Sequence, residues 1–244
     1  MTAVYAHRGA RRVAPENTLP AFAAALEMGV AGIELDVHLS RDERLVVIHD
    51  ETVDATTTGT GRVRDFTAAE LAGLDAGSRF DPAFAGIGVP TLDDTLDLIG
   101  DRCVVNIELK TADPMGGPAT EPLARLIRAR GLLDQVIVSS FNFISLMRVR
   151  TLNPAIRLGL LHYAPIPDDL RPRLMNELVR PDALHPLYTL VDETYMAWAR
   201  AYGCRVNVWT VNECADALHL RTLGVDVIMS DAPDEMMRCL GSAA

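Results

Sequence analysis

Residues 31–50 read AGIELDVHLSRDERLVVIHD. The first part alternates in polarity as a strand does, so Glu34 and Asp36 point to one face and Ile33, Leu35 and Val37 point to the other. Two neighbouring carboxylates repel each other unless a proton or a cation lies between them. The stretch therefore predicts either a strand with a polar solvent face or a strand that presents a cation site, and the rest of the chain must decide between the two.

The second apolar run, residues 45–49, follows too soon to be a parallel neighbour of the first strand. A parallel neighbour needs a crossover of about a dozen residues or more, and only residues 40–44 separate the two runs. We therefore predict a hairpin outside the parallel sheet. It would return His49 to the place where Asp36 ends.

Strands and helices alternate along most of the remaining sequence. Outside the hairpin, eight strands with helices between them are predicted at residues 4–6, 33–37, 103–109, 135–139, 156–160, 182–184, 205–209 and 225–229. This pattern predicts an α/β fold, a (β/α)8 TIM barrel, and the length of 244 residues suits one such domain spanning residues 1–244. Residues 51–90 break the rhythm, with one short helix expected at residues 68–74. We expect them to form a small capping insertion after the second barrel strand and its hairpin.

Active sites of such barrels lie at the carboxyl ends of the strands. The polar residues predicted there are His7, Arg8, Glu34, Asp36, Glu108, Lys110, Ser140, His185, Trp209, Ser230 and Asp231, and the hairpin adds His49. Three converging carboxylates suit a hard divalent cation, Mg²⁺ or Ca²⁺. Nearby Arg8 and Lys110 suit a phosphate, and His7 and His49 suit proton transfer near neutral pH. Together these groups favour phosphodiester cleavage.

Composition narrows the classes of partner and compartment. A net charge of −10 and a pI of about 5.0 argue against nucleic-acid binding. No apolar run reaches the roughly 20 residues that span a membrane, and no basic leader precedes the first strand. The four cysteines show no CxxC spacing, so we expect reduced thiols in a cytoplasmic protein. We expect either a monomer or a homodimer. His38, His162 and His219 are expected at the surface.

The motifs of the chain resemble those of glycerophosphodiester phosphodiesterases of the short bacterial cytoplasmic kind. The resemblance runs through His7-Arg8-Gly9, Pro15-Glu16-Asn17-Thr18, Glu34-Leu35-Asp36-Val37, His49-Asp50, Thr56-Thr57 with Gly59, Leu74-Asp75-Ala76-Gly77, Pro90-Thr91-Leu92, Asn106-Ile107-Glu108-Leu109-Lys110, Ser139-Ser140-Phe141, Trp209-Thr210-Val211-Asn212 and Ser230-Asp231-Ala232-Pro233. It covers nearly the whole chain in order. Two positions depart from it: Ala55 replaces a usual arginine, and Ser230 replaces a usual threonine.

The resemblance implies hydrolysis of glycerophosphodiesters to glycerol 3-phosphate and an alcohol, with a bound divalent metal. It implies metal ligation by Glu34, Asp36 and Glu108, and acid–base catalysis with His7 as the base and His49 as the acid. Arg8, Lys110, Asn17 and Trp209 are the candidates for phosphate or substrate contact, although Asn17 could instead brace the first loop and Trp209 could be simple packing.

Two other functions stay open at this point. One is a lyase of the same barrel type that forms a cyclic phosphate, as phospholipase C-like or sphingomyelinase D-like enzymes do. The other is a non-catalytic binding protein, which would be expected to have lost a histidine or a carboxylate; none is missing here.

Overall fold

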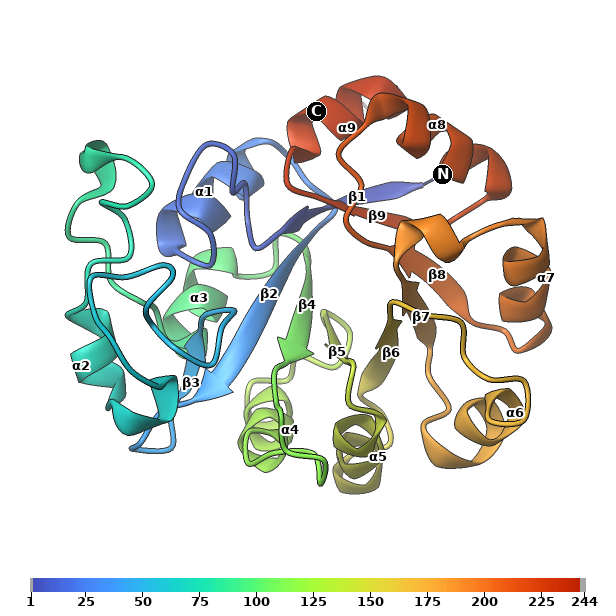
Figure 1. Ribbon diagram of the computed structural model, residues 1–244, viewed down its shortest axis with the longest axis horizontal. Coiled ribbons are helices and arrows are strands. Elements are labelled where there is room, and N and C mark those ends of the chain that lie inside the picture. Colours follow the sequence, from blue (N-terminus) through green and yellow to red (C-terminus); the bar gives the residue numbers. More distant parts are fainter. Residues whose placement is uncertain (1, 242–244) are drawn as a thin grey trace.

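Eight parallel strands close into a barrel in the computed structural model, which describes residues 2–241 (Figure 1). The strands are β1 (Ala3–His7), β2 (Gly32–Leu39), β4 (Val104–Leu109), β5 (Val136–Ser140), β6 (Arg157–His162), β7 (Ala183–Pro186), β8 (Arg205–Val208) and β9 (Val227–Ser230). Pairing of β1 with both β2 and β9 closes the ring. The predicted (β/α)8 barrel is thus confirmed.

Helices follow the strands along the chain and lie on the outside of the barrel (Figure 1). They are α1 (Leu19–Glu27), α3 (Leu92–Ile99), α4 (Thr120–Ala129), α5 (Phe143–Leu152), α6 (Arg171–Arg173) with a π-helical turn at Leu174–Leu178, α7 (Glu193–Ala201), α8 (Cys214–Leu223) and α9 (Pro233–Leu240). Their apolar faces pack with outward-facing strand residues such as Ile33, Leu35 and Ile107 into one core. Because this core lies between strands and helices, the inward faces of the strands are free to carry polar residues.

The register between β2 and β4 brings the predicted carboxylates together. Asp36 lies opposite Glu108, and Glu34 lies opposite Asn106. Side chains at paired positions of neighbouring strands point to the same face of the sheet. The alternation seen in residues 31–50 therefore places all three acids at the same end of the barrel.

The short strand β3 (Leu45–Val47) pairs antiparallel with β2, as the length of the link predicted. Val47 lies opposite Val37, and the Ile48 amide donates a hydrogen bond to the carbonyl of Asp36. His49 therefore follows directly beside the end of β2.

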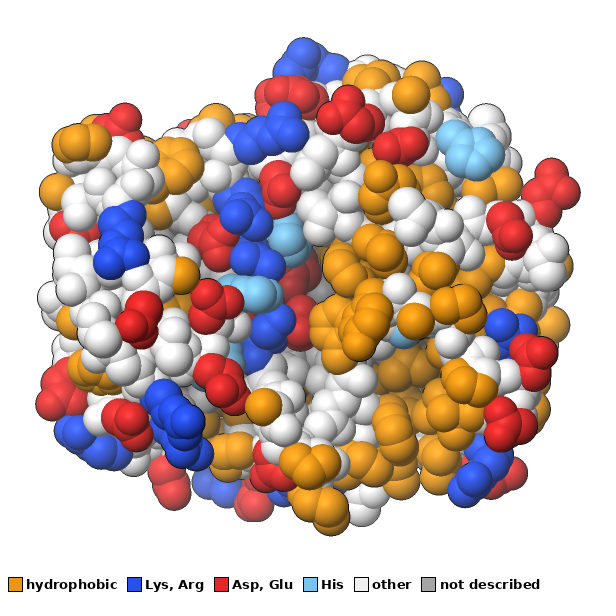
Figure 2. All heavy atoms as spheres, viewed as in Figure 1, with side chains coloured by type: hydrophobic (Ala, Val, Ile, Leu, Met, Phe, Trp, Pro, Cys, Tyr) orange, Lys and Arg blue, Asp and Glu red, His pale blue; other side chains and the backbone are white. Residues whose placement is uncertain are grey.

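Residues 51–90 contain α2 (Ala68–Ala72) and two 3₁₀ turns, Val63–Asp65 and Pro82–Phe84, and no barrel strand. They pack around a second apolar cluster that includes Val53, Val63 and Leu71. In the view of Figure 1 this segment lies beside β3 at one side of the barrel, and Figure 2 shows the central hollow open beside it.

The cysteines differ from the expectation. Cys214 and Cys239 form a disulfide between α8 and α9, so the prediction of four reduced thiols is wrong for this pair, while Cys103 and Cys204 are free. Local spacing could not reveal the pair, because only the packing of α8 on α9 brings the two residues together. Among the described residues, no helix is long and apolar enough to cross a membrane.

Candidate active site

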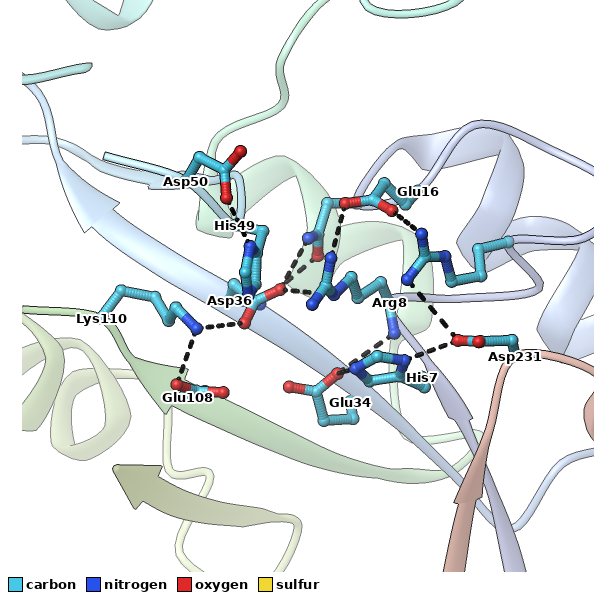
Figure 3. A network of polar contacts seen from close by, with 12 residues as sticks. His7, Arg8, Glu16, Glu34, Asp36, His49, Asp50, Glu108, Lys110 and Asp231 are labelled. Carbon is cyan, nitrogen blue, oxygen red and sulfur yellow. Dashed lines mark hydrogen bonds and ion pairs between the residues drawn. The ribbon is translucent and has the colours of Figure 1, made fainter. Parts of the chain in front are cut away.

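Three carboxylates form the centre of the site (Figure 3). Glu34, Asp36 and Glu108 each offer an oxygen, and these atoms all lie within 4.8 Å of one another. The three residues are only 3%, 1% and 8% exposed. An all-oxygen donor set of this kind suits a hard divalent cation rather than zinc.

Burial and mutual repulsion oppose full ionisation of this carboxylate triad. Burial raises the pKa of Glu34 well above its ordinary value, and the charges of Asp36 and Glu108 raise it further. Burial and the Asp36 charge likewise raise the pKa of Glu108 to about 7. A divalent ion between these oxygens would favour their ionised forms. The residues present therefore fit a divalent metal.

Two basic side chains already neutralise part of this charge. The Lys110 Nζ lies 2.9 Å from Glu108 Oε1 and 3.6 Å from Asp36 Oδ1. Arg8 Nε lies 3.4 Å from Asp36 Oδ2. Although burial opposes it, the charges of Lys110 and Arg8 lower the pKa of Asp36.

The first loop holds these groups through an unusual backbone. Arg8 and Asn17 both have positive φ angles, 57° and 55°, which non-glycine residues adopt rarely. The turn at Arg8 directs its backbone N–H to Glu34 Oε2 at 3.1 Å. Gly9 follows with φ of 80°, and a Cβ at this position would lie 2.8 Å from Ala21, so only glycine fits.

Asn17 is buried behind Asp36. Its Nδ2 donates to Asp36 Oδ2 at 2.8 Å, and its Oδ1 accepts from the Asp36 backbone N–H at 3.4 Å. Of the two roles that the sequence left open for Asn17, these bonds support the bracing role, because both ends of its amide are engaged by Asp36.

His7 is held by Asp231, a strand-end residue to which the sequence alone assigned no role. Its Nδ1 lies 2.6 Å from Asp231 Oδ1, and its Nε2 points into the site, 3.9 Å from Glu34 Oε2 (Figure 3). Asp231 is itself fixed by Asn212, whose Nδ2 donates to its Oδ2 at 2.9 Å. Although burial opposes it, the hydrogen bond from His7 lowers the pKa of Asp231 to about 2, so this carboxylate is ionised at neutral pH.

His49 shows the same arrangement at the other side of the triad. Its Nδ1 lies 2.7 Å from Asp50 Oδ1 (Figure 3). Burial, reinforced by the charges of Arg8 and Lys110, lowers the pKa of His49 against the opposing pull of Asp36. His38 Nε2 lies 3.0 Å from the carbonyl of His49 and braces this backbone.

The expectation of a surface position is wrong for two of the three histidines. His38 is half-buried against His49, and His162 is 9% exposed with its Nε2 2.8 Å from the Tyr195 hydroxyl. Both lie at the carboxyl ends of strands, His38 in β2 and His162 in β6, and only tertiary contacts reveal their partners. His219 is exposed as expected.

The remaining candidates form the floor and one wall. Trp209 lines the cavity with Phe141 and Leu161, and its Nε1 donates to the carbonyl of His185 at 2.8 Å. His185 is fully buried beneath the site, where burial lowers its pKa to about 3. Ser140 donates to the carbonyl of Leu109, so it is structural.

Comparison with known proteins gives consistent results over the whole chain. The family described as "Glycerophosphoryl diester phosphodiesterase family" matches residues 7–235. A glycerophosphodiester phosphodiesterase of Caldanaerobacter subterraneus subsp. tengcongensis is 40% identical over 237 residues, which are 97% of this chain and 96% of the relative. A glycerophosphodiester phosphodiesterase of Bacillus altitudinis is 34% identical, covering 98% of both chains.

Solved structures agree. A phosphodiesterase of Oleispira antarctica, determined in complex with the product sn-glycerol-3-phosphate, superposes with a TM-score of 0.88 at 31% identity, covering 99% of this chain and 98% of that one. A glycerophosphodiester phosphodiesterase of Agrobacterium tumefaciens gives a TM-score of 0.83 at 33% identity, covering 98% of this chain and all of that one.

Proposed function

The chain belongs to the glycerophosphoryl diester phosphodiesterase family, and from that premise we propose that it hydrolyses glycerophosphodiesters to glycerol 3-phosphate and an alcohol by metal-dependent acid–base catalysis with two histidines. The observation that carries the proposal is the buried carboxylate triad with a carboxylate-held histidine on each side of it.

We assign the metal site to Glu34, Asp36 and Glu108. A bound Mg²⁺ or Ca²⁺ would withdraw electron density from the phosphate and stabilise the negative charge that develops when an oxygen nucleophile attacks the phosphorus. Arg8 and Lys110 lie against the same carboxylates, so they would place further positive charge at a phosphate bound there. Trp209 would form a wall beside the substrate.

His7 is proposed as the base and His49 as the acid. A carboxylate can only accept hydrogen bonds, so Asp231 and Asp50 each favour the tautomer with hydrogen on Nδ1. In His7 this leaves a lone pair on Nε2, the atom that faces the triad. Through that atom His7 can take a proton from the attacking oxygen, which is a water or a glycerol hydroxyl, while protonated His49 gives one to the leaving alcohol.

The assignment can be tested with two leaving groups. A nitrophenyl group departs with little protonation, whereas choline needs a proton. His49→Ala should therefore lose far less kcat on a nitrophenyl phosphodiester than on glycerophosphocholine, and His7→Ala should lose heavily on both. Rescue of His7→Ala instead of His49→Ala would reverse the roles, and two unimpaired variants would overturn the mechanism. Phosphorus NMR of the products, run in parallel, distinguishes hydrolysis from release of a cyclic phosphate.

A further inference from the structure

The two sides of the catalytic cavity differ in chemistry. Figure 2 shows charged side chains and histidines gathered on one side of the central hollow and a broad apolar surface on the other. Among the residues that line the cavity, the charged side holds both signs, with the bases His7, Arg8, His49 and Lys110 and the carboxylates Glu34 and Glu108. Phe141, Leu161, Trp209 and Met229 line it without any charge.

The rim of the uncharged side is aromatic. Phe141 follows β5, Tyr163 follows β6 and Trp209 follows β8, so three separate strand ends contribute one ring each. The Phe141 and Trp209 rings lie 5.4 Å apart at 88°, and the Phe141 and Tyr163 rings lie 5.9 Å apart at 49°. Rings inclined in this way present faces and edges in several directions. We call these three residues the aromatic rim.

Folding does not account for the exposure of the aromatic rim. Phe141 is 39% exposed and Tyr163 is 69% exposed, in a chain with only 5% aromatic residues. Elsewhere among the described residues, Phe80 is the one other aromatic side chain with comparable exposure, at 43%. Clustered exposed rings beside a catalytic cavity indicate a ligand surface.

Charge complementarity identifies the kind of group that this surface takes. Under the proposed function the carboxylates of the charged side hold the metal and pair with Lys110, and a phosphate beside Arg8 and Lys110 fills the rest of that side. The alcohol attached to that phosphate would then extend over the opposite side, where the lining residues carry no charge. Aromatic faces attract weakly hydrated cations, and quaternary ammonium groups are those that aromatic rings recognise best. A primary ammonium is a compact and strongly hydrated charge, so it gains less from such a surface.

We propose that the aromatic rim of Phe141, Tyr163 and Trp209 binds a trimethylammonium head group, so that phosphocholine esters are the preferred diesters of this enzyme. The inference rests on the proposed phosphodiesterase function and adds to it the identity of the alcohol. The same head group occurs in glycerophosphocholine and in a monoacyl phosphocholine lipid. Both esters are therefore assayed, and the one with the higher kcat/KM identifies the source.

The decisive comparison uses an uncharged isostere. Glycerophosphocholine and the 3,3-dimethylbutyl ester of glycerol phosphate have the same shape, but only the first carries a positive charge. Glycerophosphoethanolamine and glycerophosphoglycerol serve as further substrates. We expect kcat/KM for the choline ester to exceed that for the dimethylbutyl ester by about tenfold, as expected for a partly desolvated cation–π contact. An equal or higher value for the dimethylbutyl ester would overturn the proposal, because an apolar wall alone would then suffice.

Variants locate the effect on the rim. Phe141→Leu and Tyr163→Leu keep apolar bulk but remove the π face, so each should lower kcat/KM for the choline ester about five- to tenfold and leave the dimethylbutyl ester within twofold. Phe80→Leu, an exposed aromatic position in the insertion, is the matched control and should change neither substrate. Equal losses on both esters would contradict the proposal. If none of the four glycerol phosphate esters were hydrolysed, the phosphodiesterase function itself would fail; hydrolysis of all four at similar rates would refute only the head-group assignment.

Discussion

The Asp231→Asn variant tests whether the Asp231 carboxylate determines which ring nitrogen of His7 carries the hydrogen. The hydrogen bond from His7 Nδ1 to Asp231 Oδ1 is 2.6 Å long, and the carboxylate is fixed from behind by Asn212. Hydrogen bonds to ionised groups contribute about 1.5–3 kcal/mol, which corresponds to about 10- to 150-fold in rate if the bond is needed in the transition state. An amide at this position can also turn its NH₂ toward Nδ1 and favour the wrong tautomer of His7.

We therefore expect Asp231→Asn to lower kcat on glycerophosphocholine by at least about tenfold with little change in KM. The loss should persist with a nitrophenyl leaving group, because the affected step is removal of a proton from the attacking oxygen. Asp50→Asn is the control at the other histidine. Asp50 is 44% exposed on its side chain, so its bond should contribute less, and the loss in kcat should be only a few-fold. Long-range ¹⁵N NMR of His7 reports the tautomer directly. Unchanged kcat, or a change confined to KM, would refute this reasoning.

Three further predictions follow from other parts of the structure. Lys110→Arg should lower kcat/KM at least about tenfold, because a planar guanidinium is too wide for the place where Nζ meets Glu108 at 2.9 Å and Asp36 at 3.6 Å; steady-state kinetics close to those of the wild type would show otherwise. Buried His185 has a pKa lowered to about 3, so the unfolded chain binds its proton first as the pH falls below about 6.5. The free energy of unfolding should thus fall by about 1.4 kcal/mol per pH unit between pH 6 and 4 from this residue alone. Measured by urea unfolding at several pH values, the free energy of unfolding of His185→Gln should depend less steeply on pH than that of the wild type; the same pH dependence in both would contradict the assignment. Reduction of the Cys214–Cys239 disulfide, whose sequence separation is 25, should cost roughly 3 kcal/mol of stability and lower Tm; Cys214→Ser should match the reduced wild type, and an unchanged Tm would exclude this contribution.

The barrel could be predicted because the alternation of side chains in the sequence and the lengths of the links between strands are both retained in the structure. Alternation in residues 31–50 set the faces of Glu34 and Asp36, and the short link to Leu45 required the antiparallel hairpin that carries His49. Both inferences depend on local geometry, which a sequence contains.

Partners that come from distant parts of the chain were not predicted. Asp231 reaches His7 across the closure of the barrel, and Asn17 reaches back to Asp36 from a strained loop. Neither bond has a local signature, although the place of Asp231 directly after the last strand could have suggested it. The Cys214–Cys239 pair was missed for the same reason. The expectation of a cytoplasmic location rested partly on reduced thiols, so it loses that support.

The most direct test of the account is the metal requirement of glycerophosphodiester hydrolysis. Release of glycerol 3-phosphate from glycerophosphocholine is measured for the wild type after removal of metal with EDTA, and then with Mg²⁺ or Ca²⁺ restored, alongside calorimetric metal binding by the wild type and by Glu34→Gln. We expect activity to disappear with the chelator and to return with one of the two ions. Glu34→Gln should lose most of both activity and metal affinity while it stays folded, because removing a charge relieves repulsion within the triad. Full activity of the wild type in excess EDTA would contradict it.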